Sequence, residues 1–187
     1  MKTAILILSI FFINYNLISQ EVFESDYNYG KLVIKGTSSI HDWESIVEDF
    51  SIKAEIEKEG ISVNAVSNIV MTTTVKSIKS GKGIMDSKTY TALMEEKFPS
   101  ITFKGQSENI QESEVTVTGD MTIAGVTKQI SITTRLAAIG NDLRFTGSKD
   151  LLMSDYGISP PEAVFGTIKT GDQITIEFEF NFKQIIN

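Results

Sequence analysis

The clearest structural signal in the chain is the stretch of residues 173–182, which reads QITIEFEFNF. Apolar and polar side chains alternate strictly along it, and every second residue of an extended strand points to the same face. The apolar face carries Ile174, Ile176, Phe178, Phe180 and Phe182. The stretch is therefore predicted to form a β-strand with one face in a core and the other in water.

The same alternation extends over most of the chain before this strand. Residues 114–123 repeat it clearly, and noisier versions cover about 29–38, 46–57, 61–78, 101–110, 126–139 and 142–152. Turn-forming sequences separate the runs, namely Glu59-Gly60, Ala124-Gly125 and Gly140-Asn141-Asp142. Short connections join antiparallel neighbours. We predict an all-β fold of eight antiparallel strands, which can close into a barrel or stack as a sandwich.

Two segments interrupt the strand pattern. Residues 86–97 place apolar side chains at helical spacing, with Asp86 or Ser87 as the expected cap and Pro99 as the stop. The side chains with this spacing are Tyr90, Leu93, Met94 and Phe98. One short helix among antiparallel strands is expected to act as a lid or plug at one end of a barrel. The other interruption is a long glycine- and proline-rich loop over about 153–171, and long loops in compact domains are often functional.

The first twenty residues have the layout of a secretory signal peptide. Lys2 precedes an apolar run over residues 4–13, and polar residues follow at 14–16. The run is too short to span a bilayer, which takes about 20 apolar residues, so no stable membrane anchor is expected. We predict a signal peptide over 1–20, cleaved after Ser19 or Gln20, and a β-barrel domain over 21–187. This layout predicts export to the periplasm or to the extracellular space.

Composition narrows the class of protein further. The length of 187 residues fits one domain, and the absence of cysteine excludes disulfides, thiolate metal sites and catalytic thiols. A net charge of −7 argues against nucleic acid as a partner. A hydrophobic content of 41% is too high for a disordered chain.

The strand faces that point inward mix large and small side chains. Small residues at Gly105, Gly119, Gly147 and Ala138 are expected to leave volume, and the phenylalanines are expected to line it. An apolar cavity in a barrel can hold one small ligand. The same residues can instead fill a core, and the alternation by itself favours the filled core.

Three stretches, taken in order, resemble the YceI family of exported, lipocalin-like proteins. They are residues 86–103, which end in FPSITF, residues 118–128, which read TGDMTIAGVTK, and residues 154–158, which read SDYGI. The resemblance covers about residues 28–184. It implies an eight-stranded antiparallel lipocalin-like barrel with one helical element and a long apolar cavity.

The resemblance also implies the ligand, a polyisoprenoid such as an isoprenoid quinone or a prenyl phosphate, bound without catalysis. The expected partner is thus an apolar small molecule or lipid, and no cofactor is expected beyond it. The candidate cavity residues are Ile34, Trp43, Phe50, Met71, Tyr90, Leu93, Met94, Phe103, Val117, Met121, Ile132, Leu136, Phe145, Ile176, Phe178 and Phe180. The alternative is an exported surface-binding or adhesion module with a filled barrel core. The oligomeric state stays open, with a homodimer as one alternative.

Residues typical of catalytic sites are scarce. His41 is the only histidine, so a histidine-rich zinc site is excluded, and we predict no metal and no catalytic residue. A hydrolytic triad would need His41 with Asp42, which point to opposite faces of a strand. Trp43 is expected to anchor the barrel rim, with contact to a ligand head group as the alternative. Lys79 and Lys82 near a barrel mouth could bind a phosphate, although a solvated face explains them more simply.

Overall fold

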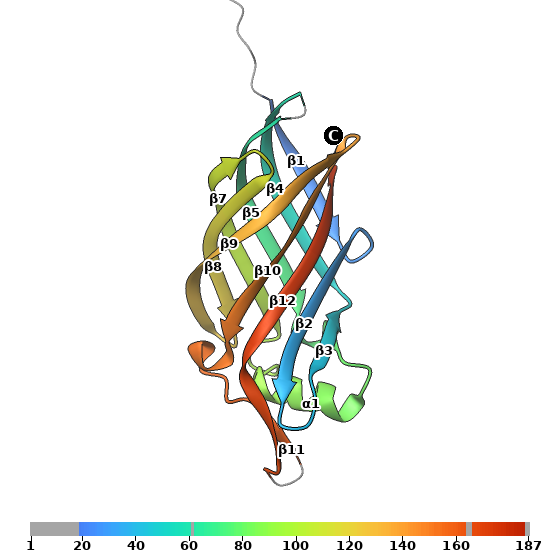
Figure 1. The fold of residues 1–187 in the computed structure, drawn as a ribbon, viewed down its shortest axis with the longest axis vertical. Coiled ribbons are helices and arrows are strands. Elements are labelled where there is room, and N and C mark those ends of the chain that lie inside the picture. The colour runs from blue at the N-terminus through green and yellow to red at the C-terminus, as the bar shows by residue number, and fades with distance from the viewer. Residues whose placement is uncertain (1–18, 61, 164–165, 186–187) are drawn as a thin grey trace, which may run out of the picture.

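The structure, a computed structural model, describes residues 19–60, 62–163 and 166–185, and these form a β-barrel with one α-helix at its end (Figure 1). The strands are β1 Ser19–Asp26, β2 Gly30–Ser38, β3 Trp43–Val47, β4 Phe50–Glu59, β5 Ser62–Thr74, β6 Ile78–Lys79, β7 Ser100–Gln111, β8 Glu114–Ile123, β9 Val126–Ile139, β10 Asp142–Leu152, β11 Glu162–Ala163 and β12 Ile168–Gln184. The helix is α1 Gly83–Ala92, and the two 3-10 turns are η1 Val75–Ser77 and η2 Met153–Tyr156. The expected signal peptide lies outside the described residues except for Ser19 and Gln20, which begin β1.

The barrel closes through antiparallel pairing alone. Hydrogen-bonded neighbours follow the order β1-β4-β5-β7-β8-β9-β10-β12, and β12 pairs back with β1. β2 continues the direction of β1, since both are antiparallel to β12. β3 and β4 are related in the same way, as are β5 and β6, so each of these pairs is one interrupted strand of the barrel. The predicted eight-stranded antiparallel barrel is confirmed.

Two expected strands are broken where the sequence analysis made them continuous. The run 46–57 belongs to β3 and β4, and the run 61–78 to β5, η1 and the start of β6. Buried hydroxyls stabilise the break. The hydroxyls of Thr73 and Ser77 both donate to the carbonyl of Asp49, at 2.6 and 3.1 Å. These bonds satisfy the carbonyl of Asp49, which lies between β3 and β4. The alternation of apolar and polar residues therefore continues in the sequence across a position where the strand pairing is interrupted.

The helix is displaced from its predicted position of 86–97. α1 begins three residues earlier and ends at Ala92, because Met94 adopts a left-handed backbone conformation with φ of 52°. The predicted side-chain cap is wrong: Lys82 is at the N-cap, and its side chain makes no capping hydrogen bond. Asp86 instead accepts bonds from the amide and hydroxyl of Ser80, at 2.8 and 2.6 Å. The carboxylate therefore ties the preceding loop to the first turn of the helix.

The small residues on the inward strand faces do not leave empty space beside them, although the sequence predicted that they would. A Cβ atom at Gly105 would lie 2.8 Å from the ring of Phe103, and one at Gly147 would lie 2.8 Å from the ring of Phe178. Phenylalanine rings thus occupy the space over these glycines. Ala138 is exposed. The prediction of a glycine-made cavity was wrong, and the glycines are sites of close packing.

The barrel interior divides into two halves. We call the first the aromatic half; it contains Phe23, Phe50, Phe103, Phe145, Phe178, Phe180 and Phe182. Its rings pack directly, with centroids 5.0 Å apart for Phe178 and Phe180 and 5.4 Å apart for Phe145 and Phe182. We call the second the open half; it lies next to α1 and η2, and its side chains surround an unfilled space.

Candidate functional site

A cavity of about 660 Å³ occupies the open half of the barrel. Its walls come from strands around the barrel, namely β2, β3, β5, β6, β7, β8, β10, β11 and β12, together with α1 and η2. Its lining is predominantly aliphatic. The volume falls within the range of about 300–1,000 Å³ that is typical of sites for small molecules. The barrel is thus not filled by its own side chains in this half, contrary to what the alternation favoured.

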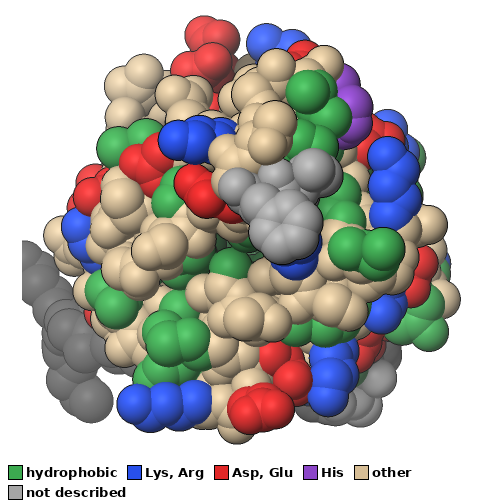
Figure 2. Space-filling model, turned by 90° about the horizontal axis from the view of Figure 1, so that it is seen from below, with side chains coloured by type: hydrophobic (Ala, Val, Ile, Leu, Met, Phe, Trp, Pro, Cys, Tyr) green, Lys and Arg blue, Asp and Glu red, His purple; other side chains and the backbone are tan. Residues whose placement is uncertain are grey.

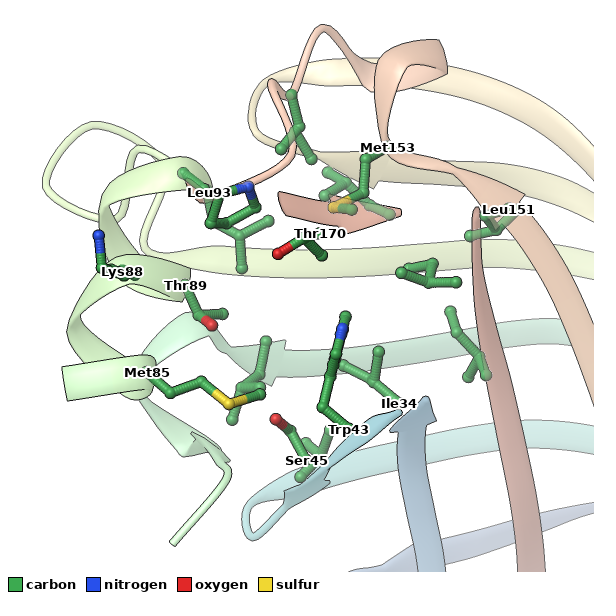
Figure 3. Close-up of a pocket in the computed structure, with 18 of the residues that line it drawn as sticks. Ile34, Trp43, Ser45, Met85, Lys88, Thr89, Leu93, Leu151, Met153 and Thr170 are labelled. Carbon is green, nitrogen blue, oxygen red and sulfur yellow. The ribbon is translucent and has the colours of Figure 1, made fainter. Parts of the chain in front are cut away.

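One face of α1 forms the lid of the cavity. Met85, Thr89, Ala92 and Leu93 line the space, and their spacing of four, three and one residues places them on one side of a helix. Figure 3 shows Met85, Thr89 and Leu93 extending from the helix toward the barrel interior. The predicted inward face comprised Tyr90, Leu93 and Met94, and of these only Leu93 lines the cavity. The helix is confirmed, and its inward face is rotated from the predicted one.

The barrel strands supply the opposite wall. Ile34 of β2 and Trp43 and Ser45 of β3 face α1 across the cavity, while Leu151 and Met153 approach from β10 and η2 (Figure 3). Ser45 is buried, so its hydroxyl is one of few polar groups in an apolar interior.

Trp43 anchors one edge of the opening. Its indole nitrogen donates to the carbonyl of Thr37 at 3.0 Å, and its ring lies over Gly36, where a Cβ atom would collide with it. The predicted rim anchor is therefore the observed arrangement. The same ring also lines the cavity, so contact with a ligand is compatible with the anchoring role.

The mouth of the cavity, seen from its own end in Figure 2, mixes hydrophobic and charged side chains. Ile40 and Ile84 line the cavity and yet are 60% and 80% exposed, so apolar surface continues from the interior to the outside. Lys82 and Lys88 also lie on the lining, and the amine of Lys88 donates to the carbonyl of Glu162 at 2.7 Å. This bond links α1 to β11.

Three ionisable groups near the cavity have shifted pKa values. Hydrogen bonds from Ser80 hold the pKa of Asp86 below its ordinary value. A hydrogen bond with Tyr90, at 2.7 Å, raises the pKa of Lys79, which does not line the cavity; the predicted phosphate role thus has no support at Lys79. Burial raises the pKa of the Tyr156 hydroxyl, which is a lining residue.

A second, smaller cavity of about 120 Å³ lies in the aromatic half. It is lined by phenylalanines and aliphatic side chains, and four residues line both cavities. The four shared residues are Leu32, Met71, Met121 and Ile176. The two spaces therefore meet at one set of side chains along the barrel axis.

Twelve of the sixteen predicted cavity residues line one or both spaces. They are Ile34, Trp43, Met71, Leu93, Phe103, Val117, Met121, Ile132, Phe145, Ile176, Phe178 and Phe180. The structure places the other four elsewhere. Phe50 packs on the ring of Phe180, Leu136 packs against the core, Met94 is exposed, and the Tyr90 hydroxyl bonds to Lys79 and to the carbonyl of Ile78.

Several lining residues were missed by the sequence analysis. Most come from the α1 face and from the segment after β10, and they include Met85, Thr89, Leu151, Met153, Tyr156 and Ile158. The amide of Ile158 donates to the carbonyl of Met153 at 3.1 Å, which turns this segment back over the barrel end. The run of large apolar residues within the predicted loop was the available signal, since exposed loops rarely carry so many.

The described residues include no group of three or more His, Cys, Asp or Glu side chains placed to hold a metal ion. His41 lies at the mouth, where a ring nitrogen is 2.8 Å from the carbonyl oxygen of Asp42. Within the part of the chain that is described, no helix has the length and apolar character needed to cross a bilayer.

Comparisons with known proteins identify the fold and the family. The family model of the YceI-like domain matches residues 32–182. Among solved structures, BcnA from Burkholderia cenocepacia superposes with a TM-score of 0.71 at 18% identity, over 84% of this chain and 98% of that one. A polyisoprenoid-binding domain from Saccharophagus degradans, implicated in plant cell wall breakdown, gives 0.68 at 9% identity, over 89% and 100%.

A third solved structure, a YceI protein from Campylobacter jejuni, gives a TM-score of 0.60 at 17% identity, over the whole of both chains. No curated protein matches the sequence. At these identities the structural likeness establishes the fold alone, whereas the match to the family model covers most of the chain.

Proposed function

We propose a function for this chain, which belongs to the YceI-like domain family: it binds an apolar lipid with a polyisoprenoid tail inside its barrel, and stores or carries it without catalysis. The observation that carries the proposal is the cavity of about 660 Å³, predominantly aliphatic and open at the α1 end. The solved domain from Saccharophagus degradans, which shares this fold, is described as polyisoprenoid-binding.

The hydrophobic effect explains why such a cavity retains a long tail. Burying one methylene group contributes about 0.8 kcal/mol, so several isoprene units together favour the bound state strongly. A tail of this kind cannot cross water unaided. A barrel that encloses the tail removes that barrier without any chemical change to the lipid.

The head group belongs at the mouth, where the polar groups gather. Lys82 and Lys88 favour an anionic head group such as a prenyl phosphate, while Ser45 and Trp43 suit the neutral ring of an isoprenoid quinone. Both head groups are compatible with the tail site, because the tail contacts are apolar in either case. We infer export to the periplasm or beyond, no membrane anchor, and leave a homodimer as an alternative to a monomer.

The direct test is extraction of the protein purified from cells, followed by mass spectrometry of the organic phase. We expect a lipid with an isoprenoid tail at a ratio near one per chain. A matched pair of variants assigns the lipid to the cavity. Thr89→Trp fills the space from the inner face of α1, while Thr91→Trp places the same ring on the exposed face of the same helix.

We expect Thr89→Trp to lose most of the lipid and Thr91→Trp to retain it. Recovery of no lipid from the wild-type protein, together with no binding of added prenyl lipids, would refute the proposal. Equal lipid content in both variants would place the lipid outside the cavity, which also contradicts it.

A further inference from the structure

The two cavities meet at a belt of four side chains, and we propose that this belt sets the length of the tail that the barrel accepts. This inference rests on the proposed function, because it concerns how the same cavity measures its ligand. We call Leu32, Met71, Met121 and Ile176 the belt; these residues line both the space of about 660 Å³ and the space of about 120 Å³.

The belt residues come from opposite walls of the barrel. Met71 of β5 and Met121 of β8 both pair with Phe103 of the strand between them, so they lie at one level of the wall. Leu32 of β2 and Ile176 of β12 lie on neighbouring strands on the other side, as the strand order requires. Side chains from two opposite walls therefore border both spaces and form the boundary between them.

A methionine side chain suits a boundary between two spaces that a lipid tail must pass. Its side chain is unbranched and has three rotatable bonds, so it adapts to neighbours of different shape. Leu32 and Ile176 have branched side chains with fewer rotatable bonds, which makes their side of the belt the more rigid one. The two methionines can therefore turn aside for a thin chain, while the opposite wall stays in place.

The smaller cavity beyond the belt has room for a fragment of defined size. An apolar cavity of about 150 Å³ can hold a benzene molecule, so about 120 Å³ corresponds to roughly one five-carbon isoprene unit. Packed phenylalanines form its wall, with the ring centroids of Phe145 and Phe182 5.4 Å apart. A tail that enters at the α1 end thus places its last isoprene unit past the belt and then meets the packed aromatic half.

This arrangement makes the belt and the small cavity the determinants of tail length. A tail one unit too short leaves the small cavity unfilled and loses the burial of about five carbons, a factor of up to about a thousand in affinity. A tail one unit too long must leave part of itself in water at the mouth. The best tail is the one that fills both spaces.

The test uses a mixture of all-trans prenyl alcohols that differ by one isoprene unit, bound to delipidated protein and read by native mass spectrometry. Ile132→Phe fills the small cavity, and Met121→Phe blocks the belt. We expect both to shift the preferred tail toward shorter alcohols by about one unit, with at least a tenfold change in the ratio of adjacent lengths. Ile132→Ala enlarges the small cavity, and we expect the opposite shift.

Met94→Phe is the matched control, because Met94 is exposed and lines neither cavity. We expect it to keep the wild-type preference. Ile132→Ala still reports the tail-length preference if Ile132→Phe and Met121→Phe fail to fold. Binding of the alcohols with the same length preference in the wild-type protein and in Ile132→Ala would overturn the role of the small cavity while leaving the proposed function intact. Binding of no prenyl alcohol by the wild-type protein would overturn the proposed function itself.

Discussion

The aromatic half and the open half of the barrel are built largely from the same strands, yet the first leaves a space of only about 120 Å³ and the second a cavity of about 660 Å³. β12 contributes Phe178, Phe180 and Phe182 to the first and Ile174 to the second, on one continuous inward face. The rings of the aromatic half fill most of the lumen and cover Gly105 and Gly147. The shorter side chains of the open half do not reach across, so a space remains, and one face of α1 lines it. The size of the side chains on the inward face of one strand therefore decides whether the barrel interior is filled or holds a cavity.

The largest expected difference between the halves concerns stability. Phe182→Ala removes a buried ring that packs edge-on against Phe145, and we expect it to lower the free energy of unfolding by about 3–5 kcal/mol. Urea unfolding of delipidated protein measures this. A loss below about 1 kcal/mol would mean that the aromatic half is not the packed core described here.

A glycine of the aromatic half gives the next largest effect. A Cβ atom at Gly119 would lie 2.6 Å from the Cα of Gly105 and would collide with the carbonyl of Lys104. We expect Gly119→Ala to cost about 1–3 kcal/mol, because backbone atoms must move. Gly83→Ala is the control: it has no neighbour within 4 Å and lies in α1, so thermal unfolding should show no loss. Equal melting temperatures for the two variants would contradict the close packing.

The open half should tolerate a comparable truncation much better. Leu93 is half-buried and faces an existing cavity, so Leu93→Ala loses few packing partners. We expect a cost of about 1 kcal/mol in the delipidated protein, below the range for a leucine in a filled core. The same urea measurement checks this. A loss in free energy of unfolding equal to that of Phe182→Ala would contradict the difference in packing between the two halves.

The smallest expected effect is a pH dependence of the lid. The folded pKa of Asp86 lies below its unfolded value of 3.8, so its contribution to stability is present above that value and is lost as the pH falls through the folded pKa. We expect the resonances of Ser80 and α1 to shift below about pH 4, while those of the aromatic half stay unchanged. NMR spectra of Asp86→Asn, which cannot titrate there, should lack this transition. A transition that persists in Asp86→Asn would assign it to another group.

The sequence predicted the strands better than the interior they enclose. Alternation located β8 to the residue, because a two-residue period directly reports which face is buried. It also located the centre of β12, but this strand begins at Ile168, within the predicted loop over 153–171, and ends at Gln184. The tight turn at Ala124-Gly125 is confirmed, and both residues have positive φ, 49° and 80°. β1 was missed because its buried side chains are Phe23 and Ser25, of which only Phe23 is apolar, so the alternation is not visible in the sequence.

Cavity positions were harder to predict for a physical reason. Alternation tells which side chains point inward but not whether opposite side chains meet, so Gly105 and Gly147 were interpreted as empty space when rings cover them. The inward face of α1 was also shifted, since Tyr90 and Met94 look apolar in the sequence. Tyr90 is instead held outside by its bond to Lys79, and Met94 by its left-handed backbone.

The attachment of α1 has a consequence for the rate of ligand exchange. The segment between β6 and β7 is held at its start by Asp86 and Ser80, at its end by the bond from the amide of Val75 to the carbonyl of Pro99 at 2.8 Å, and across the mouth by Lys88 and Glu162. A segment fixed at one end can move away from the barrel at little cost in free energy. A segment fixed at both ends moves only after some of these hydrogen bonds break. A ligand too large to leave through the existing mouth therefore exchanges only when this segment opens locally, and its residence time follows the frequency of that opening rather than the speed of diffusion.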